Sequence, residues 1–359
     1  MLIKEYFVKR TAGTADPVAL SVMTVSPDDP ADIRFTVQII HGLFDRKERW
    51  LPFMTAAAEA GGMAVIHDLR GYGNTVRNRD ELGNSGDFGY NYEVLRGDID
   101  AVYASVSRHP ADGELLECDF DSKTDTPDNP RFILGSSSGA LMTAIYLAGD
   151  TSTVAGAVLS GLPKRDPVIS LRKFFAGVRA SFVGENAKPK GLNRRLHEKY
   201  SRAFVNPSDP DPKLAWYSAD PFNRAELNAD DLCGHKKTAG SYESLCRLAR
   251  DAYRPSSYNR PRKNLQILIA AGEFDPESGG DRSVLASAKF FRDMEFSPVD
   301  IKMYRGMRHE LFRDIGRENV FADVIEFFRS NLDRENLRLG KIRGEYENVF
   351  SSSPEDKTL

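Results

Sequence analysis

Three kinds of feature are scarce in this sequence of 359 residues, and each absence excludes a class of protein. The cysteines Cys118, Cys233 and Cys246 are odd in number and lack the C-x-x-C spacing of metal and redox sites. Charged side chains interrupt every hydrophobic run before about 18 apolar residues, so we expect no membrane-spanning helix. Lys and Arg number 49 against 52 Asp and Glu, which is not the basic excess of nucleic-acid-binding proteins.

The amino-terminal segment and the overall composition indicate a folded protein of the cytoplasm. The first residues, MLIKEYFVKR, lack the apolar core of a signal peptide, and an odd set of cysteines suits a reducing compartment. Hydrophobic residues make up 41% of the chain and charged residues 28%, as in ordinary globular domains. Wholesale disorder, a collagen-like repeat and a coiled coil are therefore excluded.

Short apolar runs alternate with segments of helical length, an order typical of parallel strands joined by helical crossovers. Eight runs are predicted strands: Ile3–Val8, Val18–Val25, Phe35–Ile40, Met63–His67, Arg131–Leu134, Val154–Leu159, Leu265–Ala270 and Val299–Met303. Five segments are predicted helices: Glu48–Ala60, Tyr92–Arg108, Ser138–Ala148, Asp281–Met294 and Asn319–Leu332. We expect an α/β fold with an eight-stranded, mostly parallel sheet flanked by helices, in which the first two strands form an antiparallel edge hairpin.

One long interval, residues 163–252, has helical stretches and Pro-rich turns but no convincing strand, and we interpret it as a helical cap. The core then consists of residues 1–162 and 253–332, followed by a frayed tail over 333–359. A second insertion, residues 111–130, contains 7 acidic residues and one Lys, and we expect it to be solvated.

The strongest chemical signal is the segment FILGSSSGALMTAIYLAG, in which Gly135, Ser137 and Gly139 form G-x-S-x-G between a predicted strand and a predicted helix. In this context the serine occupies a strained turn, where a side chain at either glycine would collide with backbone. Only this register fits the motif, so Ser137 rather than Ser136 or Ser138 is the candidate nucleophile. Tight packing alone would also favour small residues here, so the assignment depends on the partners of the serine.

A serine hydroxyl needs a base at neutral pH, and the base needs an orienting carboxylate. Reactive groups of a parallel sheet gather at the C-terminal ends of its strands, and Asp275 and His309 follow the last two predicted strands. The order Ser137, Asp275, His309 is the one expected for this layout. Two further acids, Glu273 and Asp281, are alternatives. Surface or packing roles are expected for three other histidines, His109, His197 and His235.

An oxyanion hole requires fixed N–H donors near the reacting carbonyl. One donor is the backbone N–H of Ser138, which directly follows the nucleophile at a helix N-terminus. The loop after the third strand, IIHGLFDRKERW, supplies the second, which we assign to the N–H of Leu43. His41 in that loop is expected to be a buried histidine whose ring holds the loop, rather than a proton-transfer group.

Five motifs, HGLFDRKERW, HDLRGYGNT, LGSSSGA, AGEFDP and YRGMRHELF, resemble in order and spacing those of the α/β-hydrolase fold. More narrowly, they resemble the lysophospholipase and monoacylglycerol lipase branch of the serine aminopeptidase-like family. The resemblance covers about residues 35–332. It implies that Ser137 is the nucleophile, His309 the base and Asp275 the orienting acid. It also implies that Leu43 and Ser138 are the two oxyanion donors.

The chain departs from that branch at three positions near the motifs. Ser138 stands where a bulky residue is usual, and Phe44 and Asp45 stand where Gly and Glu are common. The chemistry implied by the resemblance is unaffected, whereas the identity of the substrate transfers less directly.

The resemblance implies a serine hydrolase that cleaves a carboxylic ester through an acyl-enzyme on Ser137, with a monoacyl lipid as substrate, either a lysophospholipid or a monoacylglycerol. The same residues also suit a small-ester esterase, an acyltransferase or a peptidase, and a catalytically inactive binding protein is the alternative outside enzymes. No cofactor is needed, and no cluster with metal-ligand spacing occurs in the sequence.

The predicted cap carries the expected contacts with substrate. Its first part, residues 164–202, holds 11 Lys or Arg and 3 Asp or Glu. One apolar stripe at helical spacing has basic neighbours Arg172, Lys173 and Arg179; its members are Val168, Leu171, Phe175, Val178 and Phe182. The stripe suits packing on the core, or a lid that faces acyl chains and meets an anionic membrane surface or a phosphate headgroup. The candidate substrate contacts are Phe44, Phe175, Phe182 and Trp216.

Overall fold

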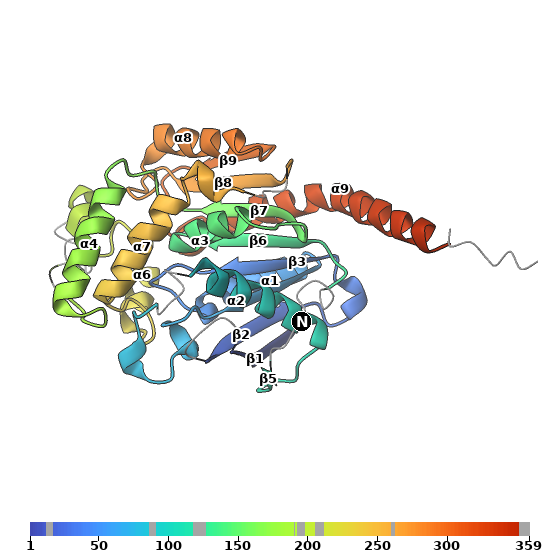
Figure 1. Cartoon of the computed structure of the whole chain (residues 1–359), viewed down its shortest axis with the longest axis horizontal. Helices are drawn as coiled ribbons and strands as arrows, with labels where there is room; N and C mark the ends of the chain where they lie inside the picture. The colour runs from blue at the N-terminus through green and yellow to red at the C-terminus, as the bar shows by residue number, and fades with distance from the viewer. Residues whose placement is uncertain are drawn as a thin grey trace, which may run out of the picture.

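A mixed sheet, in which nine strands are described, organises the chain (Figure 1). The computed structural model describes residues 1–11, 17–85, 91–117, 127–189, 191, 198–204, 212–259 and 263–351, with backbone alone from residue 336. The strands are β1 Leu2–Arg10, β2 Val18–Ser26, β3 Phe35–Ile40, β4 Gly62–His67, β5 Leu115–Glu117, β6 Arg131–Ser136, β7 Val154–Ser160, β8 Gln266–Gly272 and β9 Val299–Tyr304. Their spatial order is β5-β1-β2-β4-β3-β6-β7-β8-β9.

The pairing confirms the predicted α/β class and the mostly parallel sheet. The strands from β4 across to β9 are parallel, whereas β2 pairs antiparallel with both β1 and β4. The central strands β3, β6, β7 and β8 are buried at every residue, which explains their unbroken apolar runs. All four end at the same edge of the sheet, where the candidate site residues follow.

The prediction of eight strands, with the hairpin at the sheet edge, was wrong by one strand. The short strand β5 pairs in parallel with β1 and forms the edge. It contains only three residues, Leu115 to Glu117, and Leu115 is exposed, so no apolar pattern marks it in the sequence. Part of the acidic segment 111–130 therefore joins the sheet, while residues 118–126 of that segment lie outside the described residues.

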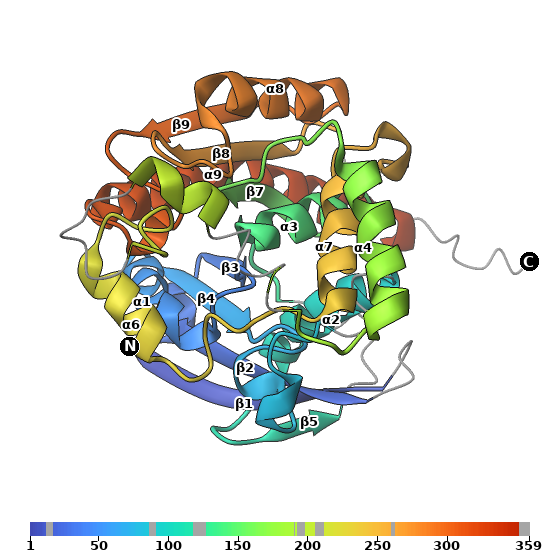
Figure 2. The ribbon, with the colours of Figure 1, turned by 90° about the vertical axis from the view of Figure 1, so that its left-hand side faces the viewer.

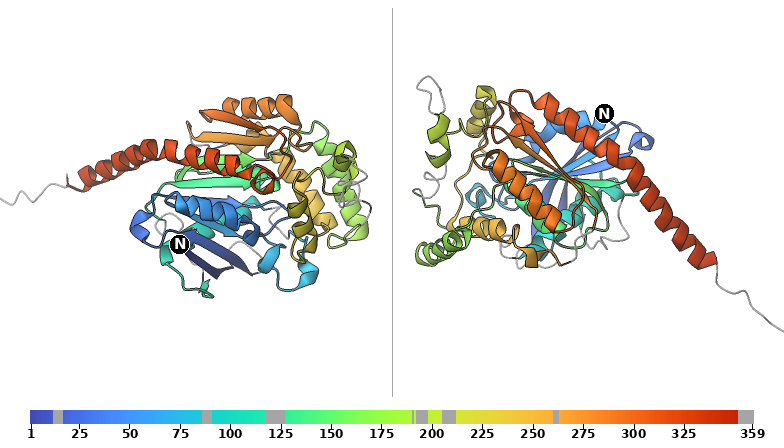
Figure 3. Two further views of the ribbon diagram at one scale, coloured as in Figure 1. Left: turned by 180° about the vertical axis from the view of Figure 1, so that it is seen from behind. Right: turned by 90° about the horizontal axis from the view of Figure 1, so that it is seen from above.

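Helices cover both faces of the sheet (Figure 3). On one face lie α1 Leu51–Glu59 and α9 Arg317–Ser351; on the other lie α2 Tyr92–Ser105, α3 Ser138–Leu147 and α8 Gly280–Asp293. Contacts between aromatic rings join α9 to the sheet, with the Phe132 and Phe328 ring centroids 4.8 Å apart. The predicted tail from residue 333 was wrong over 333–351, because α9 continues to Ser351 and extends away from the sheet (Figure 1).

The 163–252 insertion contributes α4 Ile169–Val183, α6 Pro221–Ala229 and α7 Ala239–Asp251, which lie over the C-terminal ends of the central strands (Figure 2). Over its described residues the insertion has no strand. Among the helices that the structure describes, none has the length and apolar composition needed to cross a bilayer.

The apolar stripe predicted in the insertion falls on α4 but does not pack on the core. Ala176 and Ala180 are the buried residues of α4, which lies beside α7. The larger side chains therefore point outward, and Leu171, Phe175 and Phe182 are 56%, 60% and 86% exposed. Packing on the core does not explain the stripe.

Candidate active site

Ser137 occupies a sharp turn between β6 and α3. Its φ of 57° and ψ of −122° lie in a region that a residue with a side chain rarely adopts. The turn is held by a hydrogen bond from the Ser137 N–H to the carbonyl of Ser160 on β7, at 2.8 Å. The strained turn directs the hydroxyl away from the sheet, toward the loops that follow the other strands.

The two glycines around Ser137 allow this turn to pack. A Cβ on Gly139 would stand 2.0 Å from the Ile40 carbonyl oxygen, and one on Gly135 would stand 2.3 Å from Thr143 Oγ1. Both positions therefore exclude any other residue, as the G-x-S-x-G motif predicts. The loop after β3 consequently lies directly against the turn.

The structure brings His309 and Asp275 to Ser137 in one chain of contacts. His309 Nε2 lies 2.8 Å from Ser137 Oγ, and His309 Nδ1 lies 3.0 Å from Asp275 Oδ2. Asp275 also accepts a hydrogen bond from the N–H of Glu277 at 2.8 Å. The His309 and Asp275 side chains are buried, so solvent does not compete for these contacts. A neutral His309 with hydrogen on Nδ1 can accept the Ser137 proton at Nε2.

The alternative acids lie elsewhere. Glu273 is exposed and accepts a hydrogen bond from the N–H of Gly306 at 2.9 Å. Asp281 is in the first turn of α8, as expected for a residue that favours a helix N-terminus. The carboxylates in contact with His309 are those of Asp275 and Glu277 instead.

A second carboxylate, Glu277, was missed in the sequence although it lies only two residues after Asp275. Glu277 Oε2 is 3.1 Å from His309 Nε2, the same nitrogen that faces Ser137. A carboxylate beside Nε2 stabilises the protonated ring, because the neutral ring presents a lone pair there. The free site therefore holds His309 between two carboxylates.

The pKa values of these groups reflect burial and their mutual charges. Burial lowers the pKa of His309, but the carboxylates of Asp275 and Glu277 more than compensate and raise it to about 9. Burial raises the pKa of Asp275, yet the charge and hydrogen bond of His309 bring it below its ordinary value. Burial raises the pKa of Glu277, and the Asp275 carboxylate adds to that effect.

The loop after β3 brings Leu43 beside the turn that carries Ser137. The N–H of Leu43 donates to Ser138 Oγ at 3.0 Å, so both predicted oxyanion donors belong to neighbouring residues in space. His41 holds the loop: its Nε2 accepts from the N–H of Leu69 at 3.0 Å, and its Nδ1 lies 2.7 Å from the Gly42 carbonyl oxygen. Both ring nitrogens are engaged by backbone, which confirms the expected structural role of His41.

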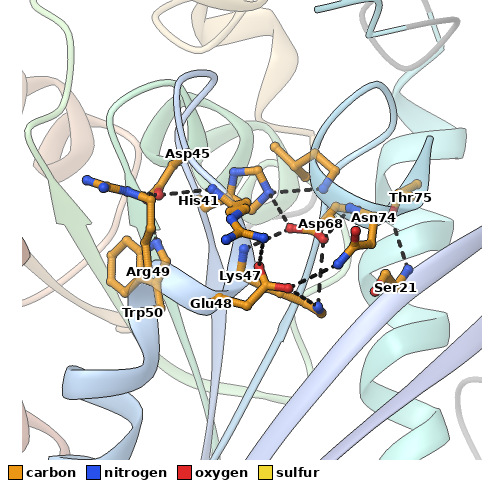
Figure 4. A network of polar contacts seen from close by, with 12 residues as sticks. Ser21, His41, Asp45, Lys47, Glu48, Arg49, Trp50, Asp68, Asn74 and Thr75 are labelled. Carbon is orange, nitrogen blue, oxygen red and sulfur yellow. Dashed lines mark hydrogen bonds and ion pairs between the residues drawn. The ribbon is translucent and has the colours of Figure 1, made fainter. Parts of the chain in front are cut away.

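Buried carboxylates hold the same loop in place (Figure 4). Asp45 accepts hydrogen bonds from Arg49 Nε at 2.8 Å and Trp50 Nε1 at 2.7 Å. Asp68, from the loop after β4, accepts from the N–H of Lys47 at 2.7 Å. These bonds pair the buried charges and hold the loop after β3 against the sheet.

Arg49 connects this loop to the histidine loop and to the insertion. Its guanidinium lies 3.1 Å from Glu310 Oε2, and Glu310 directly follows His309. Asn223 of α6 donates to the same carboxylate at 3.0 Å. Burial raises the pKa of Glu310, and the Arg49 charge opposes that effect. Three segments far apart in sequence are thereby locked together around the base.

Ser137 opens into a pocket of about 290 Å³ between the sheet and the insertion. Of the predicted substrate contacts, Phe44 and Trp216 line it, and the Trp216 ring centroid is 5.2 Å from that of His309. Phe175 lines a neighbouring groove on α4 rather than this pocket. Phe182, which is 86% exposed, is likewise not brought to Ser137. Both residues project outward because the small side chains of α4 pack inward.

Other sequence candidates are not part of this pocket. His235 Nε2 contacts the Asp231 carbonyl oxygen at 2.7 Å, and His109 ends the 3-10 turn after α2 in a left-handed conformation. His197 and Cys118 lie outside the described residues. Within the described part of the chain, no group of three or more His, Cys, Asp or Glu side chains is arranged to hold a metal ion.

The sequence from residue 31 to residue 316 matches the model of the family described as serine aminopeptidase, S33. This range contains Ser137, Asp275 and His309 as well as the whole insertion. No curated protein sequence matches the chain.

Solved structures share the fold at low sequence identity. A thermostable carboxyl esterase from Bacillus coagulans in complex with glycerol is 20% identical over 92% of this chain and 99% of that chain, with a TM-score of 0.74. A monoglyceride lipase from Saccharomyces cerevisiae bound to a substrate analogue is 17% identical over 89% of this chain and 94% of that chain, with a TM-score of 0.65. An epoxide hydrolase from Vigna radiata is 16% identical over 90% of this chain and 98% of that chain, with a TM-score of 0.56. At these identities the likeness establishes the fold alone.

We predict that the rate at which a fluorophosphonate labels Ser137 rises with pH through a midpoint near the His309 pKa of about 9. Below that pH the ring is protonated and cannot accept the serine proton; above it the ring is neutral. Glu277→Gln removes one of the carboxylates that raise this pKa, so the midpoint should move to lower pH by about one unit. Labelling rates measured across the neutral and alkaline range give both midpoints.

Glu273→Gln is the matched control, since it neutralises a carboxylate of the same loop that does not contact His309. It should leave the midpoint in place. A midpoint that is identical in the wild type and Glu277→Gln would show that Glu277 does not act on the base.

Proposed function

Because the chain belongs to the serine aminopeptidase S33 family of α/β-hydrolases, we propose that it hydrolyses a carboxylic ester of a monoacyl lipid, either a lysophospholipid or a monoacylglycerol. The observation that carries the proposal is the unbroken series of contacts from Ser137 through His309 to Asp275, at 2.8 Å and 3.0 Å. The acyl group would be held on Ser137, and the 163–252 insertion would act as the cap over the site.

In the first half of the reaction, Ser137 Oγ attacks the ester carbonyl carbon while its proton passes to His309 Nε2. Asp275 orients the ring and stabilises the imidazolium. The negative charge that develops on the carbonyl oxygen is received by the N–H groups of Leu43 and Ser138. His309 then returns the proton to the leaving alcohol, and the acyl group remains on Ser137.

In the second half, a water molecule occupies the place that the alcohol leaves. His309 accepts a proton from this water as its oxygen attacks the acyl carbon, and the same N–H groups again stabilise the oxyanion. Collapse of the intermediate returns the proton to Ser137 and releases the carboxylic acid. Each step uses groups of the chain itself.

A lipid substrate is supported by the apolar lining of the pocket beyond Ser137. Leu141 of α3, Ile169 of α4 and Leu245 and Ala249 of α7 contribute to that lining, with Trp216 beside the base. An acyl chain in contact with these side chains is removed from water, which favours binding by about 0.8 kcal/mol per buried methylene. The monoglyceride lipase of similar fold, bound to a substrate analogue, agrees with this class of substrate.

We predict that a fluorophosphonate labels Ser137 and that hydrolysis of p-nitrophenyl esters becomes faster from short to long acyl chains. Mass-spectrometric mapping of the adduct and kcat/KM along the chain series give the two readouts, with Ser137→Ala as control. Labelling with a short-chain preference would favour a small-ester esterase instead. Folded protein that is neither labelled nor active would favour a binding protein that keeps the fold.

Asp275→Asn should lower kcat by about 10⁴-fold, because the amide would favour the wrong tautomer of His309. The measurement is steady-state hydrolysis of the best p-nitrophenyl ester, with Asp281→Asn as a control carboxylate outside the pocket. Near-normal activity in Asp275→Asn would contradict the assignment of Asp275 as the orienting acid.

We further propose that the exposed face of α4 contacts an anionic membrane surface. Phe174, Phe175 and Phe182 project from this face, and Arg172, Lys173 and Arg179 lie on the same helix. Aromatic side chains beside cations are typical of helices that lie in the interface of a bilayer. The groove on α4 shares Arg172 with the pocket of Ser137, so a lipid leaving the surface would have a short path to the site.

Neutralising Arg172, Lys173 and Arg179 together should weaken binding to anionic vesicles by about a hundredfold, since each charge contributes about 1 kcal/mol at such a surface. Vesicle sedimentation and lipid hydrolysis on vesicles provide the measurement. The control neutralises three exposed lysines of the core, Lys263, Lys289 and Lys302. Vesicle binding and kinetics that equal those of the wild type would rule out this contact.

A further inference from the structure

A buried lysine lines the pocket that contains Ser137. Lys237 directly precedes Thr238, the N-cap of α7, and only 3% of it is exposed. Its Nζ lies 3.8 Å from the centroid of the Phe44 ring, and Phe44 follows the oxyanion-loop residue Leu43. Lysine is rarely enclosed in this way unless its charge is paired, because burial of an ammonium group opposes folding. The same pocket is therefore lined by Ser137 and by a buried cation.

The charges around the pocket favour an anion as its occupant. Among the residues that the structure describes, the pocket lining includes five cationic side chains, Lys164, Arg165, Arg172, Lys199 and Lys237, and two carboxylates, Asp166 and Glu277. Arg172 lies 2.9 Å from Asp166, so these two charges balance each other. If the Glu277 carboxylate neutralises Lys237, the three remaining cations, Lys164, Arg165 and Lys199, still give these residues a net positive charge. Low-dielectric walls strengthen this field at Lys237 relative to the exposed lysines at the mouth.

We propose that Lys237 is the residue that selects an ester substrate bearing a negatively charged group, a phosphate or a carboxylate, near the bond that is cleaved. The inference rests on the proposed ester hydrolysis and narrows its substrates to anionic esters. The Lys237 ammonium would donate a charge-assisted hydrogen bond to the anion, and the stacked Phe44 ring would hold the lysine side chain in place.

The pKa of Lys237 supports the same role. Burial lowers it to about 8, and the Glu277 carboxylate opposes that effect. The side chain is therefore charged below about pH 8 and loses its charge above it in the free enzyme. The preference for an anionic ester should decline as the pH rises through this value, whereas turnover should rise through the higher pKa of His309, about 9. The pH dependence of selectivity is thus distinct from that of turnover.

Lys237 has a second possible role, as the counter-ion of Glu277. Glu277 contacts His309, so loss of its counter-ion would alter the base and would slow all esters equally. A role in substrate selection instead changes the ratio of kcat/KM between an anionic and a neutral ester. The ratio is also independent of the fraction of a variant that is correctly folded, because both esters are cleaved by the same molecules.

The test measures that ratio for two matched pairs of esters. The first pair is monododecanoylglycerol and its phosphate monoester, and the second is p-nitrophenyl butyrate and p-nitrophenyl hemisuccinate. The first pair carries the anion on the alcohol, as in a lipid headgroup, and the second carries it on the acid. Lys237→Met keeps a long, unbranched side chain without the charge, and Lys236→Met removes the charge of the exposed neighbour.

The wild type should prefer the anionic member of at least one pair, and Lys237→Met should lower that preference by about ten- to a hundredfold, as expected for loss of a hydrogen bond between charged groups. Lys236→Met should retain the preference. The inference is overturned if the wild type shows no preference for an anion, or if Lys237→Met slows both members of each pair equally. Failure of the proposed function would look different, because no variant would then cleave any of the four esters.

Discussion

The start of α3 lies so close to the end of β3 that no side chain fits between them, and the candidate site depends on this contact. A Cβ at Gly139 would stand 2.0 Å from the Ile40 carbonyl oxygen. The turn at Ser137 and the loop that carries Leu43 are therefore built as one rigid unit. The strained backbone of Ser137 persists because the surrounding packing determines it, as is usual for strain at functional sites. Everything else in the site is positioned relative to that unit.

Buried ion pairs connect this rigid unit to the other loops of the site. Arg49 lies between Asp45 in the loop after β3 and Glu310 beside His309, so the Leu43 loop and the His309 loop share one cation. Removing one member would leave a buried charge without compensation, which is strongly destabilising. Glu277 follows the same principle at the histidine, where it biases the ring toward its protonated form. A single electrostatic network thus sets the geometry of the site and, in the proposed reaction, the pH range of activity.

The sequence predicts the sheet and the group formed by Ser137, Asp275 and His309, because both follow local rules. Central strands are buried on both faces and appear as apolar runs, and reactive residues follow strand ends. By contrast, β5 is too short to have a pattern, and the direction of the α4 stripe depends on which side of the helix meets α7. Glu277 and Lys237 are polar residues in a loop and an insertion, where no periodicity predicts burial; only tertiary packing brings them to the pocket. The length of α9 was missed because residues after 332 lose apolar periodicity, although Arg, Glu, Leu and Lys are good helix formers.

The hydrogen bond from the Leu43 N–H to Ser138 Oγ means that this donor already has an acceptor before an ester arrives. A neutral ester carbonyl would replace one uncharged acceptor by another, with little net gain. The charged oxygen of the tetrahedral intermediate is a far stronger acceptor, so the exchange becomes favourable only as the reaction proceeds. In the proposed reaction, Ser138 therefore weakens the interaction of Leu43 with the ground state but not with the transition state. An interaction that is stronger in the transition state raises turnover rather than affinity.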